Sequence, residues 1–159
     1  MTMAAETATE VVKLSHSYVF PRERVFEAWT KAEVLGQWFG PHSHDCKVEE
    51  YDFREGGDYQ IRMIPVREDH DCKGDPEADS VCAGSFVEIK PDERIVMTFG
   101  WIENAADIGE TLLTIEFTAT AAGTDIVLTH ERLPNEELRR AHEGGWQGTL
   151  ECLEEYLSK

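Results

Sequence analysis

The sequence predicts a single α+β domain in which an antiparallel sheet is closed by a long C-terminal helix. Its length of 159 residues is that of one ordinary domain and is enough to bury a core. Between residues 46 and 130, most segments alternate apolar and polar side chains with a period of two, as half-buried strands do. After residue 134, apolar side chains recur every three or four residues, which is typical of an amphipathic helix.

The N-terminal part predicts one strand and two short helices. Residues 1–10 (MTMAAETATE) are expected to form a disordered tail, and residues 11–20 (VVKLSHSYVF) form a strand because they are rich in β-branched and aromatic side chains. Pro21 suits the first turn of a helix, and the apolar positions of residues 22–29 then repeat with helical spacing. A second helical turn covers residues 31–38 before a Gly-Pro pair ends it.

Six further strands follow one another along the chain. We expect them at residues 46–53, 59–63, 81–89, 95–101, 113–117 and 126–130. Strands joined by such short connections pair as an antiparallel meander. The acidic segment 68–79 (EDHDCKGDPEAD) interrupts this series and predicts a solvated loop.

The C-terminal helix begins after Asn135, a good N-cap residue, and extends for about 22 residues. Its interior contains Gly144, Gly145 and Gly148, each of which costs up to about 1 kcal/mol relative to alanine. Either the sheet or a bound molecule approaches this helix closely, or small residues simply pack against the sheet, and we favour the second interpretation.

The charge is strongly acidic, with 32 Asp and Glu against 15 Lys and Arg and a net charge of −17. Such a chain is not suited to non-specific nucleic-acid binding, which needs cations to displace phosphate counterions, or to docking on anionic membranes. We expect no membrane insertion, because no apolar run is long enough to span a bilayer. The first ten residues do not resemble a secretory signal, so we expect a cytoplasmic protein.

Histidine and cysteine side chains gather in two segments of the sequence. The weak metal candidates are His42, His44, Cys46, His70, Cys72 and Cys82. These could build a zinc site if the two segments met, but their spacing matches no common zinc motif. The interpretation we favour is polar loop residues and small buried thiols, with no metal. No nucleophile, metalloprotease or phosphate-binding motif is present, and we expect no cofactor.

Four segments carry a family resemblance: PRERVFEAWTKAEVLGQWFGP, DFREGGDYQIRM, GSFVEIKPDERIVMTFGW and HERLPNEELRRAHEGGWQGTLECLEEYL. The chain from about residue 11 to residue 158 resembles the bacterial single-domain members of the AHSA-type family. This family is similar to the C-terminal domain of the activator of the heat-shock chaperone ATPase, and it belongs to the START-like helix-grip superfamily.

The resemblance implies a helix-grip fold, in which a seven-stranded curved sheet wraps around the C-terminal helix and two short helices lie between strands one and two. It also implies a cavity between sheet and helix that holds lipids, sterols or polyketides in relatives. The segment 68–79 is longer than is usual in the family. The eukaryotic activator engages the chaperone through a separate N-terminal domain that these 159 residues do not contain, so we do not expect chaperone stimulation.

The function we expect is binding of a small hydrophobic or aromatic ligand in that cavity. Strand parity, helix spacing and the family's cavity together select the candidate ligand-binding residues. They are Trp38, Phe39, Tyr59, Ile61, Met63, Phe86, Met97, Phe99, Trp101, Ile115, Phe117, Leu128, His130, Trp146 and Leu150. Each of these side chains could equally be plain core.

Two alternatives remain open from the sequence. By strand parity, His130 and Glu88 could face one cavity and act as a base and its orienter in a cyclase or dehydratase. Otherwise His130 lies near solvent at a strand end, and Glu88 is a surface acid. The acidic surface and the edge strands of an open sheet would also suit a protein-interaction or co-chaperone-like domain, including a homodimer.

Overall fold

The structure, a computed structural model, describes residues 10–40, 44–65, 80–103 and 108–159. The elements follow the order β-α-α-β-β-β-β-β-β-α expected from the sequence. They are β1 (Glu10–Tyr18), α2 (Arg22–Glu27), α3 (Ala32–Leu35), β2 (His44–Tyr51), β3 (Asp58–Pro65), β4 (Ser80–Lys90), β5 (Arg94–Glu103), β6 (Thr111–Ala119), β7 (Thr124–Leu133) and α4 (Glu136–Leu157). The predicted acidic loop at 68–79, and nearly all of the predicted tail at 1–10, lie outside the described residues.

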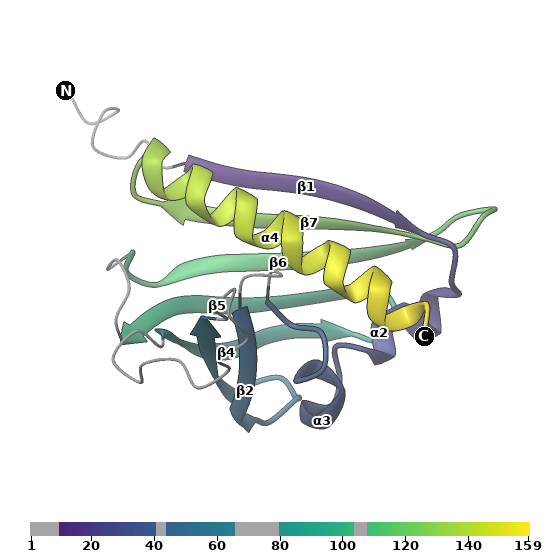
Figure 1. Cartoon of the computed structure of the whole chain (residues 1–159), viewed down its shortest axis with the longest axis horizontal. Coiled ribbons are helices and arrows are strands. Elements are labelled where there is room, and N and C mark those ends of the chain that lie inside the picture. The colour runs from purple at the N-terminus through teal and green to yellow at the C-terminus, as the bar shows by residue number, and fades with distance from the viewer. Residues whose placement is uncertain (1–9, 41–43, 66–79, 104–107) are drawn as a thin grey trace.

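The seven strands form one antiparallel sheet in the order β1-β7-β6-β5-β4-β3-β2. Strands β2 to β7 are a meander, and β1 joins its far side by pairing with β7. The connection from β1 to β2 therefore crosses the whole sheet, and α2 and α3 lie within it. α4 runs across one face of the curved sheet, and α2 lies beside its C-terminal end (Figure 1). The predicted helix-grip architecture is confirmed.

The curvature of the sheet has a local cause in irregular strand pairing. β4 shifts its register against β5 twice, between Val81 and Cys82 and between Phe86 and Glu88. A bulge of this kind bends a strand and increases its twist. Gly84 adds to the close pairing of β4 and β5, because a Cβ atom there would lie 2.1 Å from the carbonyl oxygen of Thr98.

α4 is fastened to the sheet mainly along β1. Its buried side chains, which include Trp146, Leu150 and Leu153, recur at helical spacing and enter the core. The Tyr18 hydroxyl of β1 donates a hydrogen bond of 2.9 Å to the carbonyl oxygen of Leu150. At the other end, the Asn135 side chain accepts from the Leu138 amide at 2.9 Å, which confirms the predicted N-cap.

No helix in the described part of the chain is both long enough and apolar enough to cross a membrane.

Candidate functional site

A pocket of about 310 Å³ separates the N-terminal half of α4 from strands β3 to β5. α4 lies along β1, and the bulged strands on the other side of the sheet do not fill the space beneath its first turns. The residues lining the pocket are Phe39, Gly40, His44, Met63, Ser80, Cys82, Phe99, Trp101, Leu138, Ala141, His142, Gly145, Trp146 and Thr149. The elements that meet there are therefore α4, β2, β3, β4, β5 and the residues that follow α3.

The pocket wall is largely apolar, and none of its lining residues carries a carboxylate, ammonium or guanidinium group. Polar side chains of the wall, such as those of Thr149 and His142, already have hydrogen-bond partners within the protein. The Thr149 hydroxyl donates to the carbonyl oxygen of Gly145 at 2.8 Å. Burial lowers the pKa of His44, which favours its neutral form. The pocket is thus suited to an uncharged molecule.

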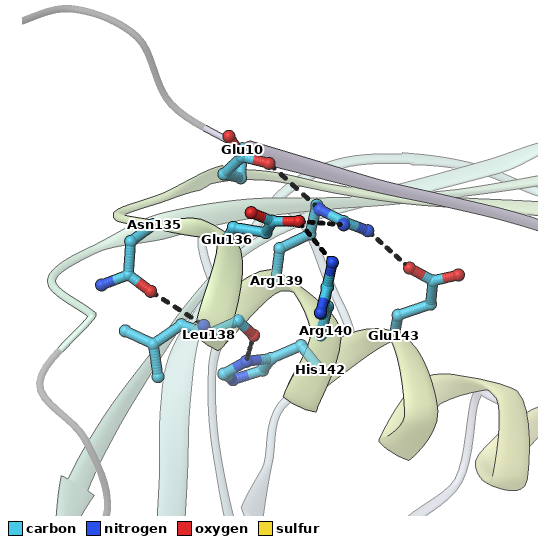
Figure 2. A network of polar contacts seen from close by, with 8 residues as sticks. All are labelled: Glu10, Asn135, Glu136, Leu138, Arg139, Arg140, His142 and Glu143. Atoms are coloured by element: carbon cyan, nitrogen blue, oxygen red, sulfur yellow. Dashed lines mark hydrogen bonds and ion pairs between the residues drawn. The ribbon is translucent and has the colours of Figure 1, made fainter.

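His142 and Trp101 form a polar pair in the pocket wall. The Trp101 indole N–H donates to Nε2 of His142 at 2.9 Å, so this nitrogen carries no proton. Nδ1–H of His142 then donates to the carbonyl oxygen of Leu138 at 2.7 Å, and Figure 2 shows this bond inside the first turns of α4. Burial lowers the pKa of His142, and the bond to Leu138 opposes this only in part. Both ring nitrogens are engaged, and the imidazole is neutral near pH 7.

The first turns of α4 are held over the pocket by a network of charges (Figure 2). Arg139 Nε lies 3.0 Å from a carboxylate oxygen of Glu10 on β1, and its Nη1 lies 2.7 Å from Glu143. Its Nη2 lies 3.9 Å from Glu136, which also pairs with Arg140 at 2.6 Å. The helix end that covers the pocket is therefore tied directly to the edge of the sheet.

His130 lies deeper, in the core beneath the pocket. The Trp146 indole N–H donates to its Nδ1 at 3.0 Å. Because the Thr111 hydroxyl donates to the Phe99 carbonyl, Nε2–H of His130 donates to the oxygen of Thr111 at 2.7 Å. Burial, and then the nearby His142, lower the pKa of His130 to about 3. Neither nitrogen is left for a substrate, and the contacts instead orient Trp146.

Glu88 lies away from both histidines. Its side chain is 34% exposed and is paired with Lys90 at 3.8 Å and Arg94 at 3.6 Å. Simple alternation places Glu88 on the same face as Phe86, but the bulge between these two residues breaks that alternation. The structure therefore does not bring His130 and Glu88 to a common point in a cavity, as an acid–base pair requires.

Comparison with known proteins then identifies the family. The family described as "Activator of Hsp90 ATPase homolog 1-like protein" (AHSA1) matches residues 19–158, which is most of the chain. The chain belongs to the AHSA1 family. No curated protein matches it.

Solved structures of similar proteins share the fold of this AHSA1 chain. A protein from Chromobacterium violaceum is 26% identical, with a TM-score of 0.74 over 91% of this chain and 95% of that one. The AHSA1 protein from Silicibacter pomeroyi is 21% identical, with a TM-score of 0.78 over 94% and 98% of the two chains. A protein from Nitrosomonas europaea is 25% identical, with a TM-score of 0.68 over 93% and 94%. These likenesses show that the fold is shared, and the names of the three proteins give no ligand.

The structure divides the candidate ligand-binding residues of this AHSA1 chain into two groups. The residues that line the pocket are Phe39, Met63, Phe99, Trp101 and Trp146. Those that lie outside its lining, in the core, are Trp38, Tyr59, Ile61, Phe86, Met97, Ile115, Phe117, Leu128, His130 and Leu150. Three of this second group (Tyr59, Ile61 and Met97) line a separate inner void of about 10 Å³.

Most of the α4 residues that line the pocket were not among the candidate ligand-binding residues. The lining residues that sequence reasoning missed are Gly40, His44, Ser80, Cys82, Leu138, Ala141, His142, Gly145 and Thr149. The glycines inside the helix were the feature of the sequence that could have indicated these residues. The interpretation favoured above is that they pack against the sheet. That interpretation is wrong for Gly144 and Gly145, because a Cβ atom on either would meet nothing within 4 Å. Gly145 instead borders the pocket.

Among the described residues, no group of three or more His, Cys, Asp or Glu side chains is arranged to hold a metal. His44 and Cys82 line the pocket, and the Cys46 thiol lies 3.9 Å from the Leu35 carbonyl oxygen. Burial raises the pKa of Cys46 to about 11 and raises that of Cys82 as well, so both thiols are protonated near pH 7 and are poor ligands. The candidates His42, His70 and Cys72 lie outside the described residues.

Proposed function

We propose that this protein binds a compact, uncharged and largely apolar ligand, aromatic or polyketide-like, in the pocket between α4 and strands β3 to β5. The observation that supports this is the pocket itself, about 310 Å³ in volume and lined mainly by aromatic, aliphatic and thioether side chains. Ligand sites are typically concave, mostly apolar and furnished with a few polar groups. Met63 in the wall adds adaptability, because its unbranched thioether fits ligands of different shape.

The size of the pocket favours a small ligand. Its volume of about 310 Å³ lies at the lower end of the range for small-molecule sites, roughly 300 to 1,000 Å³. A molecule of one to three rings suits this space better than a sterol or a long acyl chain. The wall is neutral and the chain carries a net charge of −17, which together disfavour an anionic ligand.

Two neighbouring glycines of α4 give a direct test. Gly145 borders the pocket, Gly144 is exposed, and a Cβ atom on either meets nothing within 4 Å. Gly145→Leu is expected to fill part of the pocket and to weaken binding of the neutral dye N-phenyl-1-naphthylamine at least about tenfold, a loss of about 1.4 kcal/mol. Dye fluorescence in a titration measures this affinity.

Gly144→Leu is the matched control, and it is expected to leave the dye affinity unchanged. Both variants should be more stable to thermal unfolding than the natural chain, by about 0.8 kcal/mol, because leucine favours the helix more than glycine does. If both variants show this gain in stability, weaker dye binding by Gly145→Leu results from the filled pocket and not from a damaged fold. Equal dye binding by the two variants, or no saturable binding by the natural chain, would contradict the proposal.

A further inference from the structure

A second, smaller void lies directly behind the pocket. Its volume is about 10 Å³, roughly the space that a single water molecule needs. Phe39, Phe99 and Trp146 line both spaces, so the same three rings separate the void from the pocket. Trp29 and Met97 line the void but not the pocket. The void therefore lies next to the pocket, behind the three shared rings, and has room for about one atom.

Trp29, which lines this void, carries an unused hydrogen-bond donor. Its side chain is fully buried, and its indole N–H has no acceptor among the described residues. The other three indole N–H groups each donate to a named acceptor: Trp38 to the Ala28 carbonyl, Trp101 to His142, and Trp146 to His130. A buried donor without a partner costs about 1 to 3 kcal/mol, and such groups are rare.

The Trp29 ring is held too firmly to find an acceptor elsewhere. It packs edge-on against Trp38, with ring centroids 4.8 Å apart, and against Phe117 at 6.2 Å. Its carbonyl oxygen accepts a hydrogen bond from the Tyr51 hydroxyl, which fixes the backbone at this turn. Turning the ring would disturb both ring contacts, so an acceptor has to be brought to it.

We propose that Trp29 is the polar anchor at the inner end of the pocket, and that the ligand carries a terminal carbonyl or ether oxygen that accepts its N–H. This inference rests on the proposed function and adds the class of ligand to it. The ring system of the ligand lies in the outer pocket, and its oxygen reaches the void when Phe39 and Trp146 move apart, since these rings pack edge to face with centroids 5.8 Å apart. Met97 at the void gives way most easily, because a thioether chain has several accessible shapes.

A matched pair of ligands tests this anchor. Acetophenone and α-methylstyrene have nearly the same shape, but only the ketone has an oxygen that accepts a hydrogen bond. Calorimetric affinities of both are measured for the natural chain, for Trp29→Phe and for Trp38→Phe. The ratio of the two affinities removes any general loss of packing in a variant, and comparing this ratio between proteins cancels the difference in hydration between the two ligands.

The preference for the ketone is expected to fall about fivefold in Trp29→Phe and to stay unchanged in Trp38→Phe. An equal ratio in all three proteins overturns the anchor; if Gly145→Leu still weakens both ligands, the proposed function stands. No binding of either ligand to the natural chain overturns the anchor and counts against the proposed function as well.

An NMR measurement on the natural chain does not depend on whether Trp29→Phe folds. The assigned indole proton of Trp29 is expected to move downfield when acetophenone binds and to stay in place with α-methylstyrene. A cross-peak from this proton to a buried water that persists with the ketone bound would overturn the proposal, since water would then be the acceptor.

Discussion

The two ring nitrogens of His130 make hydrogen bonds that require its neutral form. One accepts from Trp146 and the other donates to Thr111, so protonation of Nδ1 would set two donors against each other. Together with burial this accounts for a pKa of about 3 in the folded chain. A histidine in the unfolded chain titrates near about 6.5. His130 is therefore a neutral structural residue that positions Trp146 in the pocket wall.

The stability of the protein should consequently fall with pH below about 6.5. Between the folded and unfolded pKa values the unfolded chain binds the extra proton, so the free energy of unfolding decreases as pH decreases. From about pH 7 to about pH 5.5, His130 accounts for about 1 kcal/mol of this loss. His130→Gln is expected to remove that share, as measured by urea unfolding at both pH values.

This comparison carries its own control, because the hydrogen bonds lost in His130→Gln lower stability equally at both pH values and cancel in the difference. An unaltered pH dependence in the variant would show that His130 titrates normally in the folded chain.

At the scale of elements, the guanidinium of Arg139 forms a clamp between the first turns of α4 and β1. Arg139 reaches carboxylates on both elements, and its side chain is 24% exposed, whereas Arg140 is 71% exposed and contacts Glu136 alone. We expect Arg139→Ala to cost about 1 kcal/mol of stability, and Arg140→Ala less than about 0.5 kcal/mol. Urea unfolding measures both changes.

Hydrogen exchange locates the effect of the clamp. The amides of the first turns of α4 should exchange faster in Arg139→Ala than in Arg140→Ala, because only the first variant removes the ion pair between these turns and Glu10 of β1. Equal costs and equal exchange in the two variants would mean that the clamp contributes nothing beyond ordinary surface charge.

The elements themselves were largely predictable, because periodicity and capping are local properties. The helix of 22 residues after Asn135 and all seven strands lie close to the predicted positions. Strand parity was unreliable where a bulge intervened, and Glu88 is the example, because an extra residue between paired positions leaves no clear trace in the sequence. The register of β4 against β5 can be established only from the structure.

The candidate site was predictable only in part. Phe99 and Trp101 follow from alternation, and Trp146 from helical spacing, but His142 and Gly145 belong to a helix face that a straight sheet would cover. Whether such a face meets core or a pocket depends on sheet curvature, which is a property of many residues together. The unpaired donor of Trp29 was hidden for the same reason, since pairing is a matter of three-dimensional neighbours.

At the scale of the whole molecule, an excess of acid surrounds a neutral pocket. The chain has 32 acidic and 15 basic side chains, yet the pocket wall contains neither kind. The electrostatic field of the negatively charged protein should therefore repel anions, while the pocket wall offers no cation to attract them. This distinguishes ligands of the same shape by their charge.

A pair of dyes measures this discrimination. 1-Anilinonaphthalene-8-sulfonate is N-phenyl-1-naphthylamine with one added sulfonate. At low salt we expect the sulfonate to bind at least about tenfold more weakly than the neutral dye, and the gap to narrow as salt rises from about 0.02 M to about 0.5 M. The neutral dye serves as the control for salt effects on apolar binding. A sulfonate that binds as tightly at low salt would contradict the prediction.

The strand order also leads us to expect a particular order of folding events. Each strand of the meander from β2 to β7 lies beside its neighbour in the chain, so these hairpins close short loops. β1 has to wait for β7, since Glu10 pairs with Leu133 and Tyr18 with Thr124. We therefore expect β1, which precedes the other six strands of this sheet in the chain, to join the sheet last, and α4, which packs mainly on β1, to dock only then. The pocket covered by that helix would then be completed in the final step of folding.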